Sequence, residues 1–325
     1  MATLGVLGQA LVDLIYSVNS DQIAALGLTV NSHQLIDTSK SSRIQNDLLS
    51  FPHAVVSGGS ALNSLVAYAL LGGKAGAFFR TGCDRFADLF KHELSLINAR
   101  FVVKTDEVLP TGHSLILSDP AQGRAMATCL GAADIFRRNE VPTDFFTNHE
   151  ALLLEGYMLA ISGSEFLDCF RDANQSGKRT ICTLSAPWIV NSQREKVLQA
   201  LAFSSVVIAN EEEASALTES TNPVENVKII AGLLAKERED PLVVITAGAN
   251  GSYVGSSNVV EHVPAAPTTV KDLTGAGDAF AGAFLFSFLH GKTPIFAARE
   301  ATLLASAVIS QIGARATPEI IRGKA

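Results

Sequence analysis

From residue 150 onward, short apolar segments alternate with segments of helical pattern. Apolar runs at 151–154, 180–183, 205–208 and 242–246 predict buried strands. Helical patterns occupy 164–176, 192–202, 211–217 and 224–237. Strands and helices that alternate in this way are typical of a parallel sheet with helices on both faces. The sequence therefore predicts an α/β fold with a three-layer α/β/α core and a mostly parallel central sheet.

The first part of the chain adds short β segments to this core. A strand is expected at 4–8, a helix at 61–71 that ends at Gly72, a strand at 76–79 and a helix at 84–97. Residues 14–50 mix short apolar stretches with polar turns, and β pieces are expected at 101–103 and 113–117. We expect one α/β domain over 1–325, with inserted segments at about 14–50 and 101–131 that form a small β-sheet lid.

Composition excludes several classes of protein. Hydrophobic residues make up 47% and charged residues 18% of the 325 residues, which excludes an intrinsically disordered chain. The net charge of −7 argues against a nucleic-acid or anionic-membrane partner. We expect no membrane span, because no apolar run reaches the required length. The start is a poor signal peptide and the four cysteines form no CxxC pair, so we expect a cytoplasmic protein.

The segment from Asp272 to Leu289 carries the strongest chemical signal. Gly275 and Gly277 allow a tight turn, and an almost entirely apolar helix follows them. Free N–H groups at such a helix start favour an anion, most naturally a phosphate. Asp278 in the first turn is placed to accept a proton from an attacking hydroxyl. The alternative is a plain glycine turn with an acid that suits the helix dipole. The Walker A, GxGxxG and HExxH patterns all fail.

Three motifs resemble the ribokinase-like (PfkB) kinase family along essentially the whole chain. DLTGAGDAFAGAF, starting at Asp272, resembles its C-terminal signature. Its N-terminal signature, a Gly-Gly pair, a helix and a second Gly-Gly pair, is matched from Gly58 to Gly73, and its NxxE element by Asn210 to Glu213. The segments from Gly8 to Asp13 and from Arg124 to Ala133 are similar to the adenosine kinase-like branch. Gln9 departs from that branch, which usually has Asn there.

This resemblance implies a role for each matched residue in phosphoryl transfer. Asp278 would be the general base, and the backbone N–H groups of Gly275, Ala276 and Gly277 would form the anion hole. Arg124 would neutralise phosphate charge from the lid. The resemblance places the acceptor substrate against Asp13, Gln9, Gly58, Gly59 and Asn63. It places the nucleotide against Asn210, Thr246, Gly248, Thr274, Gly275 and Gly277.

The implied cofactors are ATP and Mg²⁺, with K⁺ as a further cation that the resemblance allows. Glu213 would hold Mg²⁺ indirectly, through water, although an acid at a helix start also simply suits the helix dipole. The expected reaction transfers the γ-phosphoryl of Mg·ATP to the primary hydroxyl of a nucleoside, adenosine foremost. A sugar kinase and a catalytically silent nucleotide-binding protein are the alternatives. Either a monomer or a homodimer is compatible with the sequence.

Overall fold

The computed structural model describes residues 3–48, 53–97, 99–119, 123–234 and 241–323. Its larger sheet has nine strands in the order β14-β13-β12-β11-β10-β9-β1-β5-β6. The seven parallel strands are β1 (Thr3–Leu7), β5 (Lys74–Thr81), β6 (Ala99–Thr105), β9 (Ala151–Glu155), β10 (Arg179–Thr183), β11 (Val206–Asn210) and β12 (Leu242–Thr246). β13 (Ser252–Gly255) and β14 (Val260–Val263) continue the sheet in antiparallel fashion. The predicted, mostly parallel central sheet is confirmed.

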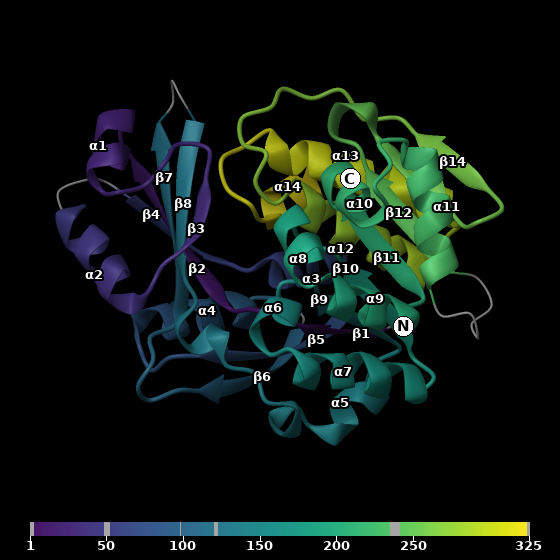
Figure 1. The fold of residues 1–325 in the computed structure, drawn as a ribbon, viewed down its shortest axis with the longest axis horizontal. Coiled ribbons are helices and arrows are strands. Elements are labelled where there is room, and N and C mark those ends of the chain that lie inside the picture. Colours follow the sequence, from purple (N-terminus) through teal and green to yellow (C-terminus); the bar gives the residue numbers. More distant parts are fainter. Residues whose placement is uncertain (1–2, 49–52, 98, 120–122, 235–240, 324–325) are drawn as a thin grey trace.

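Helices cover both faces of this sheet (Figure 1). On one face lie α3 (Ser60–Leu70), α4 (Arg85–Ser95), α12 (Ala276–Leu289) and α13 (Pro294–Ile309). The other face carries α5 (Thr143–Asn148), α6 (Met158–Ile161), α7 (Ser164–Gln175), α8 (Pro187–Ser192), α9 (Arg194–Ala202), α10 (Glu211–Thr218) and α11 (Pro223–Leu233). Successive β9 side chains point to opposite faces, so Leu153 joins the first core while Leu152 and Leu154 join the second. The three-layer core is therefore as predicted.

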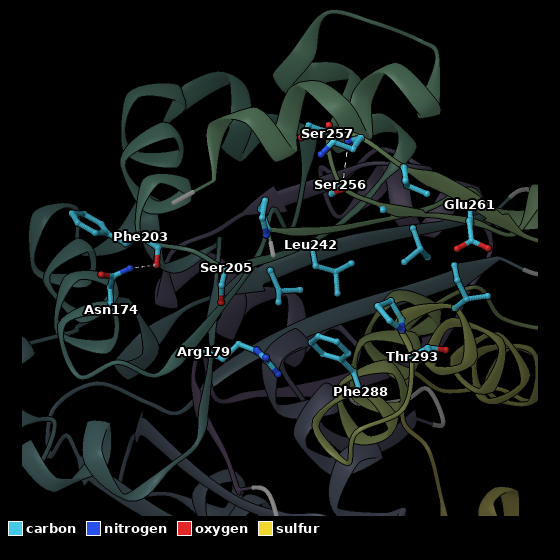
Figure 2. Close-up of a pocket in the computed structure, with 18 of the residues that line it drawn as sticks. Asn174, Arg179, Phe203, Ser205, Leu242, Ser256, Ser257, Glu261, Phe288 and Thr293 are labelled. Atoms are coloured by element: carbon cyan, nitrogen blue, oxygen red, sulfur yellow. Dashed lines mark hydrogen bonds between the residues drawn. The ribbon is translucent and has the colours of Figure 1, made fainter. Parts of the chain in front are cut away.

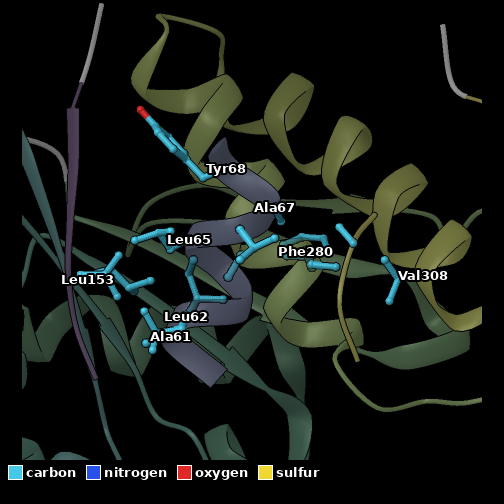
Figure 3. Close-up of a cluster of buried hydrophobic side chains, with 14 of the residues drawn as sticks. Ala61, Leu62, Leu65, Ala67, Tyr68, Leu153, Phe280 and Val308 are labelled. Carbon is cyan, nitrogen blue, oxygen red and sulfur yellow. The ribbon is translucent and has the colours of Figure 1, made fainter. Parts of the chain in front are cut away.

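The start of α3 is held against α12 by close packing. Leu62 and Leu65 of α3 lie in the same buried cluster as Phe280 of α12 (Figure 3). A Cβ on Gly282 of α12 would collide with the Ser64 carbonyl oxygen, so only glycine permits this approach. The two helices that carry Asn63 and Asp278 are thus fixed relative to each other.

A second sheet, here called the lid sheet, has five strands in the order β3-β8-β7-β2-β4. They are β2 (Leu11–Ser17), β3 (His33–Leu35), β4 (His53–Gly58), β7 (Gly112–Asp119) and β8 (Gly123–Cys129). Together with α1 (Ser20–Ala25) and α2 (Thr38–Asp47), it stands to one side of the central sheet (Figure 1). The two sheets are joined by short connections: Gly8–Ala10 links β1 to β2, and Gly59 links β4 to α3.

The lid differs from the expectation in two respects. Residues 14–50 contain two helices, whose N-termini are capped by Asn19 and Asp37, as well as strands. Residues 101–105 belong to β6, which pairs with β5 at the edge of the central sheet rather than entering the lid sheet. Residues 49–50 and 120–122 of the expected lid segments, and 235–237 of an expected helix, lie outside the described residues.

The remaining described elements are short. They are α14 (Pro318–Arg322) and the 3-10 helices η1 (Gly131–Asp134), η2 (Arg138–Glu140) and η3 (Gly248–Asn250). Within the described ranges, no helix is both long enough and apolar enough to cross a lipid bilayer.

Candidate active site

The N-terminus of α12 presents free backbone donors. Its N-cap, Gly275, has a φ of 76°, in the left-handed region, and a Cβ there would collide with the backbone of Ala314. No described residue accepts a hydrogen bond from the N–H groups of Gly275 or Gly277, whereas Ala276 donates to the Leu273 carbonyl at 3.4 Å. Gly277 is exposed. These donors, together with the positive end of the helix dipole, make this turn suited to an anion.

Asp278, in the first turn of α12, is held by two donors from α3. The Ser60 hydroxyl donates to one carboxylate oxygen at 2.6 Å, and Asn63 Nδ2 donates to the other at 2.9 Å. Burial raises the pKa of Asp278, and the two hydrogen bonds and the charge of Arg315 oppose that rise. The carboxylate is thus fixed in orientation beside the turn that opens α12, with a raised proton affinity.

Asp13, on β2, brings a second carboxylate to the junction of the two sheets. Its Oδ2 lies so close to Gly58 that a Cβ on the glycine would stand 2.7 Å away. Burial raises the pKa of Asp13 to about 6, and the negative charge of Asp278 contributes to this rise. The positive charges of Arg315 and Arg124 lower the pKa and offset part of the rise. No described residue donates a hydrogen bond to this carboxylate, so its acceptor oxygens are available to hydroxyl groups.

Gln9 and Gly59 complete the sheet junction. Gly59 has a φ of 98°, and a Cβ there would collide with the Gln9 carbonyl. The Gln9 N–H donates to Glu155 Oε2 at 3.2 Å, and burial raises the pKa of Glu155 to about 8. Gln9 Nε2 is buried and has no partner among the described residues. The acceptor residues that the sequence predicts on β2, β4 and α3 therefore lie around one junction.

Arg124 joins the lid sheet to the loop before α12. Its Nη1 lies 3.1 Å from Asp272 Oδ1 and also bonds the Thr274 hydroxyl. Asp272 in turn accepts from the Thr274 N–H at 2.9 Å and the Gly313 N–H at 3.1 Å. Burial would raise the pKa of Asp272, but these hydrogen bonds and the Arg124 charge hold it below its usual value. The predicted lid arginine thus reaches the loop that leads into α12.

Three of the residues predicted to bind the nucleotide, Asn210, Thr246 and Gly248, lie at or just after the carboxyl ends of neighbouring strands. Asn210 ends β11 and Thr246 ends β12, and the two residues are paired in register. Gly248 follows Thr246 and opens η3, with open space beside its Cα. Ligands of open α/β sheets bind outside this edge. The structure gives no contact that ties Gly248 to Asp278.

Glu213 has a structural role that the sequence also allowed. Asn210 and Glu213 form a capping box: Asn210 Oδ1 accepts from the Glu213 N–H at 2.8 Å, and Glu213 Oε2 accepts from the Asn210 N–H at 3.0 Å. Asn210 Nδ2 also donates to Glu213 Oε1 at 2.8 Å. Burial and the negative charge of Asp278 raise the pKa of Glu213 to about 7, against the hydrogen bond from the Asn210 N–H. Each Glu213 oxygen keeps a lone pair for water, which fits a magnesium ion held through its hydration shell. No group of three His, Cys, Asp or Glu side chains suited to a metal occurs among the described residues.

Sequence reasoning missed three residues of this site. Ser60 lies directly after the Gly-Gly pair, and Asp272 opens the glycine-rich motif, so both have a local signal. Arg315 contacts Asn63 and Gly58, more than 250 positions away along the chain. An isolated arginine after a short loop gives no local indication of such contacts.

A separate cavity of about 1550 Å³ lies at the amino ends of the central strands, away from the carboxyl ends that carry the predicted site (Figure 2). Its lining includes Arg179, Ser205 and Leu242, at or next to the amino ends of β10, β11 and β12. Arg179 lies over the Phe288 ring at 4.8 Å. None of the predicted site residues lines this cavity. Ligands of parallel sheets bind at the carboxyl ends of the strands, not at their amino ends.

Comparisons with known proteins agree with the geometry. The chain is 27% identical to adenosine kinase from Saccharomyces cerevisiae over 90% of both chains. The crystal structure of adenosine kinase from Sinorhizobium meliloti superposes with a TM-score of 0.88 and 27% identity, covering 100% of this chain and 99% of the other. That of a probable sugar kinase from Rhizobium etli also gives 0.88, at 28% identity, covering 99% and 98%.

Fold, site and relatives together define a phosphotransferase with an alcohol group as acceptor. The chain belongs to the pfkB family of carbohydrate kinases, whose pattern it matches over residues 20–321. Its relatives and structural neighbours place it in the adenosine kinase-like branch of that family.

Proposed function

We propose that this enzyme transfers the γ-phosphoryl of Mg·ATP to the primary hydroxyl of a nucleoside, with adenosine as the first candidate. The observation that carries the proposal is the position of Asp278, fixed by Ser60 and Asn63 beside the free N–H groups at the start of α12. The adenosine kinases of yeast and S. meliloti, similar along nearly their whole length, support the choice of acceptor.

The acceptor binds at the junction of the two sheets. Asp13 offers a carboxylate without a protein donor, which suits two neighbouring hydroxyl groups of a ribose. Gly58 permits the close approach of the Asp13 carboxylate and Gly59 that of the Gln9 carbonyl, so the two glycines allow this junction to form. Gln9 and Asn63 border the same space and orient the acceptor.

Asp278 takes the proton from the acceptor hydroxyl as the hydroxyl oxygen attacks the γ-phosphorus, and the bond from that phosphorus to the β–γ bridging oxygen breaks to release ADP. Phosphoryl transfer needs positioning and charge stabilisation more than covalent chemistry. The N–H groups of Gly275, Ala276 and Gly277 stabilise the charge on the transferred group, with each lost donor costing about 3 kcal/mol. Arg124 adds a positive charge from the lid, and the closed lid sheet excludes water, which would otherwise compete as acceptor.

The nucleotide lies along the carboxyl ends of β11 and β12. Asn210, Thr246 and Gly248 border it there, and Thr274 lies beside its phosphates. Mg²⁺ supplies positive charge to the phosphates when bound, and Glu213 holds its water shell through the lone pairs that the capping box leaves free.

A sugar kinase is the second candidate. The R. etli relative is named a probable sugar kinase and is as similar to this chain as the S. meliloti adenosine kinase. A carboxylate at Asp13 suits the neighbouring hydroxyls of a free sugar as well as those of a ribose.

A panel of acceptors tests the proposal. ADP release from Mg·ATP is measured with adenosine, other nucleosides, ribose and fructose as separate acceptors. Turnover selective for a nucleoside is expected. Turnover with a free sugar alone would establish the second candidate. A folded protein that binds ATP but turns over no acceptor would favour a silent nucleotide-binding protein.

Replacing Asp278 tests the base directly. Asp278→Asn keeps the size of the side chain and removes its proton affinity, so kcat should fall by roughly 10²- to 10⁴-fold. The Kd for Mg·ATP, measured by calorimetry, should change little, because the base contacts the acceptor. Near wild-type turnover of the variant would exclude Asp278 as the base.

A further inference from the structure

Arg315, on the loop between α13 and α14, makes an unusual number of contacts from one guanidinium group. Its side chain is 15% exposed, and its Nη1 lies 3.2 Å from Glu93 Oε2 on α4. The same nitrogen bonds the Ser57 hydroxyl on β4, and Nη2 lies 3.5 Å from the Gly58 carbonyl. Arg315 therefore links the C-terminal loop to α4 and to the acceptor side of the lid sheet.

The fourth contact reaches the base through Asn63. Arg315 Nε donates to Asn63 Oδ1 at 3.0 Å, while Asn63 Nδ2 donates to Asp278 at 2.9 Å. An amide has one accepting end and one donating end, and an ionised carboxylate can only accept. Because the guanidinium occupies the accepting end, the amide group of Asn63 has to turn its donating end toward Asp278.

We propose that Arg315 is a positioning residue for phosphoryl transfer, which orients the Asn63 amide toward the base and places a fixed positive charge beside it. The inference rests on the proposed role of Asp278 as the base. Arginine suits this task because its planar fork of donors contacts several acceptors at once and stays charged when buried.

The charges around Asp278 support this role. The negative charge of Asp278 raises the pKa values of Asp13, Glu155, Tyr157 and Glu213, so these groups share its electrostatic surroundings with Arg315. Arg315 is the cation among the described residues whose charge lowers the pKa of Asp278, while burial raises that pKa. Without Arg315, the base should remain protonated to a higher pH.

The test measures kcat against pH, with both Mg·ATP and the acceptor saturating, in wild type and Arg315→Met. The acid limb of the variant should move to higher pH by about one unit, so kcat on this limb should fall by up to about tenfold. Arg315→Lys keeps the charge but loses the fork, so its acid limb should stay near that of wild type while kcat falls.

A matched control is Arg80→Met. Arg80 is 11% exposed and pairs with Asp106 at 3.5 Å and with Glu140. This variant should lose stability without moving the acid limb, which separates a general loss of buried ion pairs from a specific effect at the base.

A cycle with Asn63→Leu tests the path through the amide. If Arg315 acts through Asn63, the fall in kcat at the pH optimum in the double variant Asn63→Leu, Arg315→Met should be much smaller than the product of the falls in the two single variants. Fully independent effects would contradict the proposed orientation.

The failures of the two proposals are distinguishable. An active wild type and a folded Arg315→Met with unchanged kcat and acid limb would overturn the role of Arg315 and leave the kinase intact. No turnover by wild type with any acceptor would overturn both. If Arg315→Met does not fold, Arg315→Lys decides: wild-type kcat in that variant would overturn the inference.

Discussion

At the scale of single residues, the site concentrates carboxylates whose burial raises their pKa. Asp13, Glu155, Glu213 and Asp278 all hold protons more tightly than usual. A buried carboxylate without full compensation destabilises the folded state when it is ionised. The protein thus retains acidic groups at a cost in stability, which is expected where they bind hydroxyl groups and accept a proton.

Asp13 allows this cost to be measured. Its pKa rises from 3.8 to about 6 on folding, so the folded state binds the proton more tightly than the unfolded chain does. The wild-type free energy of unfolding should therefore fall as pH rises from about 4 to about 6. At pH 8 the free energy of unfolding of Asp13→Asn should exceed that of wild type by about 3 kcal/mol, and the difference should disappear below pH 4.

The same variant should lose acceptor affinity. Removing one charged hydrogen-bonding group should raise KM for the acceptor by roughly 10- to 100-fold and leave KM for ATP nearly unchanged. Urea unfolding at several pH values, combined with steady-state kinetics, measures both effects. A variant less stable than wild type at pH 8, or altered only in its ATP kinetics, would contradict this account of Asp13.

At the scale of elements, the two glycines at the start of α12 have different roles. Gly275 permits the left-handed turn and the close approach of Ala314, whereas Gly277 has open space beside it. The first glycine is needed to form the turn, and the second leaves room in front of it.

Alanine at each position separates these roles. Gly275→Ala should lower the free energy of unfolding by about 2 kcal/mol or more, because of the positive φ and the collision with Ala314. Gly277→Ala should change stability by less than about 1 kcal/mol, yet lower kcat/KM for ATP at least tenfold, because its methyl group would occupy the approach to the N–H groups. Thermal unfolding and initial rates distinguish the two, and equal stability losses would contradict the assignment.

A feature of the fold or the site can be predicted from the sequence when the residues that determine it lie in the same segment. The central strands and α3, α7 and α10 follow from apolar runs and glycine stops that lie within each segment. The helices α1 and α2 are polar and begin at asparagine and aspartate caps, so residues 14–50 resemble turns. The place of β6 depends on pairing with β5, and that of Arg315 on contacts with distant residues, and neither has a local signal.

At the scale of the whole molecule, Arg124 fastens the lid sheet to the loop before α12. The ion pair with Asp272 joins two segments 148 positions apart, and its side chains are 38% and 21% exposed. Partly exposed pairs contribute little to overall stability. We therefore expect the Arg124–Asp272 pair to affect the position of the lid sheet more than the stability of the fold.

Replacing Arg124 tests this. Arg124→Gln should change the free energy of unfolding by less than about 1 kcal/mol, while amide hydrogen exchange in β7 and β8 should become faster. The kcat should fall by roughly 10- to 100-fold, because a positive charge near the transferred phosphoryl is lost. Arg171→Gln, which breaks an exposed pair with Asp168 on α7, serves as the control. If amide hydrogen exchange in β7 and β8 were unchanged in Arg124→Gln, Arg124 would have no role in holding the lid in place.

The short connections between the sheets couple the lid to the acceptor site. Gly8–Ala10 joins β1 to β2 and Gly59 joins β4 to α3, so the lid sheet cannot tilt without moving Gln9 and Asp13. Tilting of the lid and binding of the acceptor are then two descriptions of one equilibrium. The two binding events are therefore thermodynamically linked. A molecule that binds only to the open lid lowers the affinity for the acceptor by a certain factor, and the acceptor lowers the affinity for that molecule by the same factor. Inhibitors of this enzyme can thus compete with the acceptor without occupying its site.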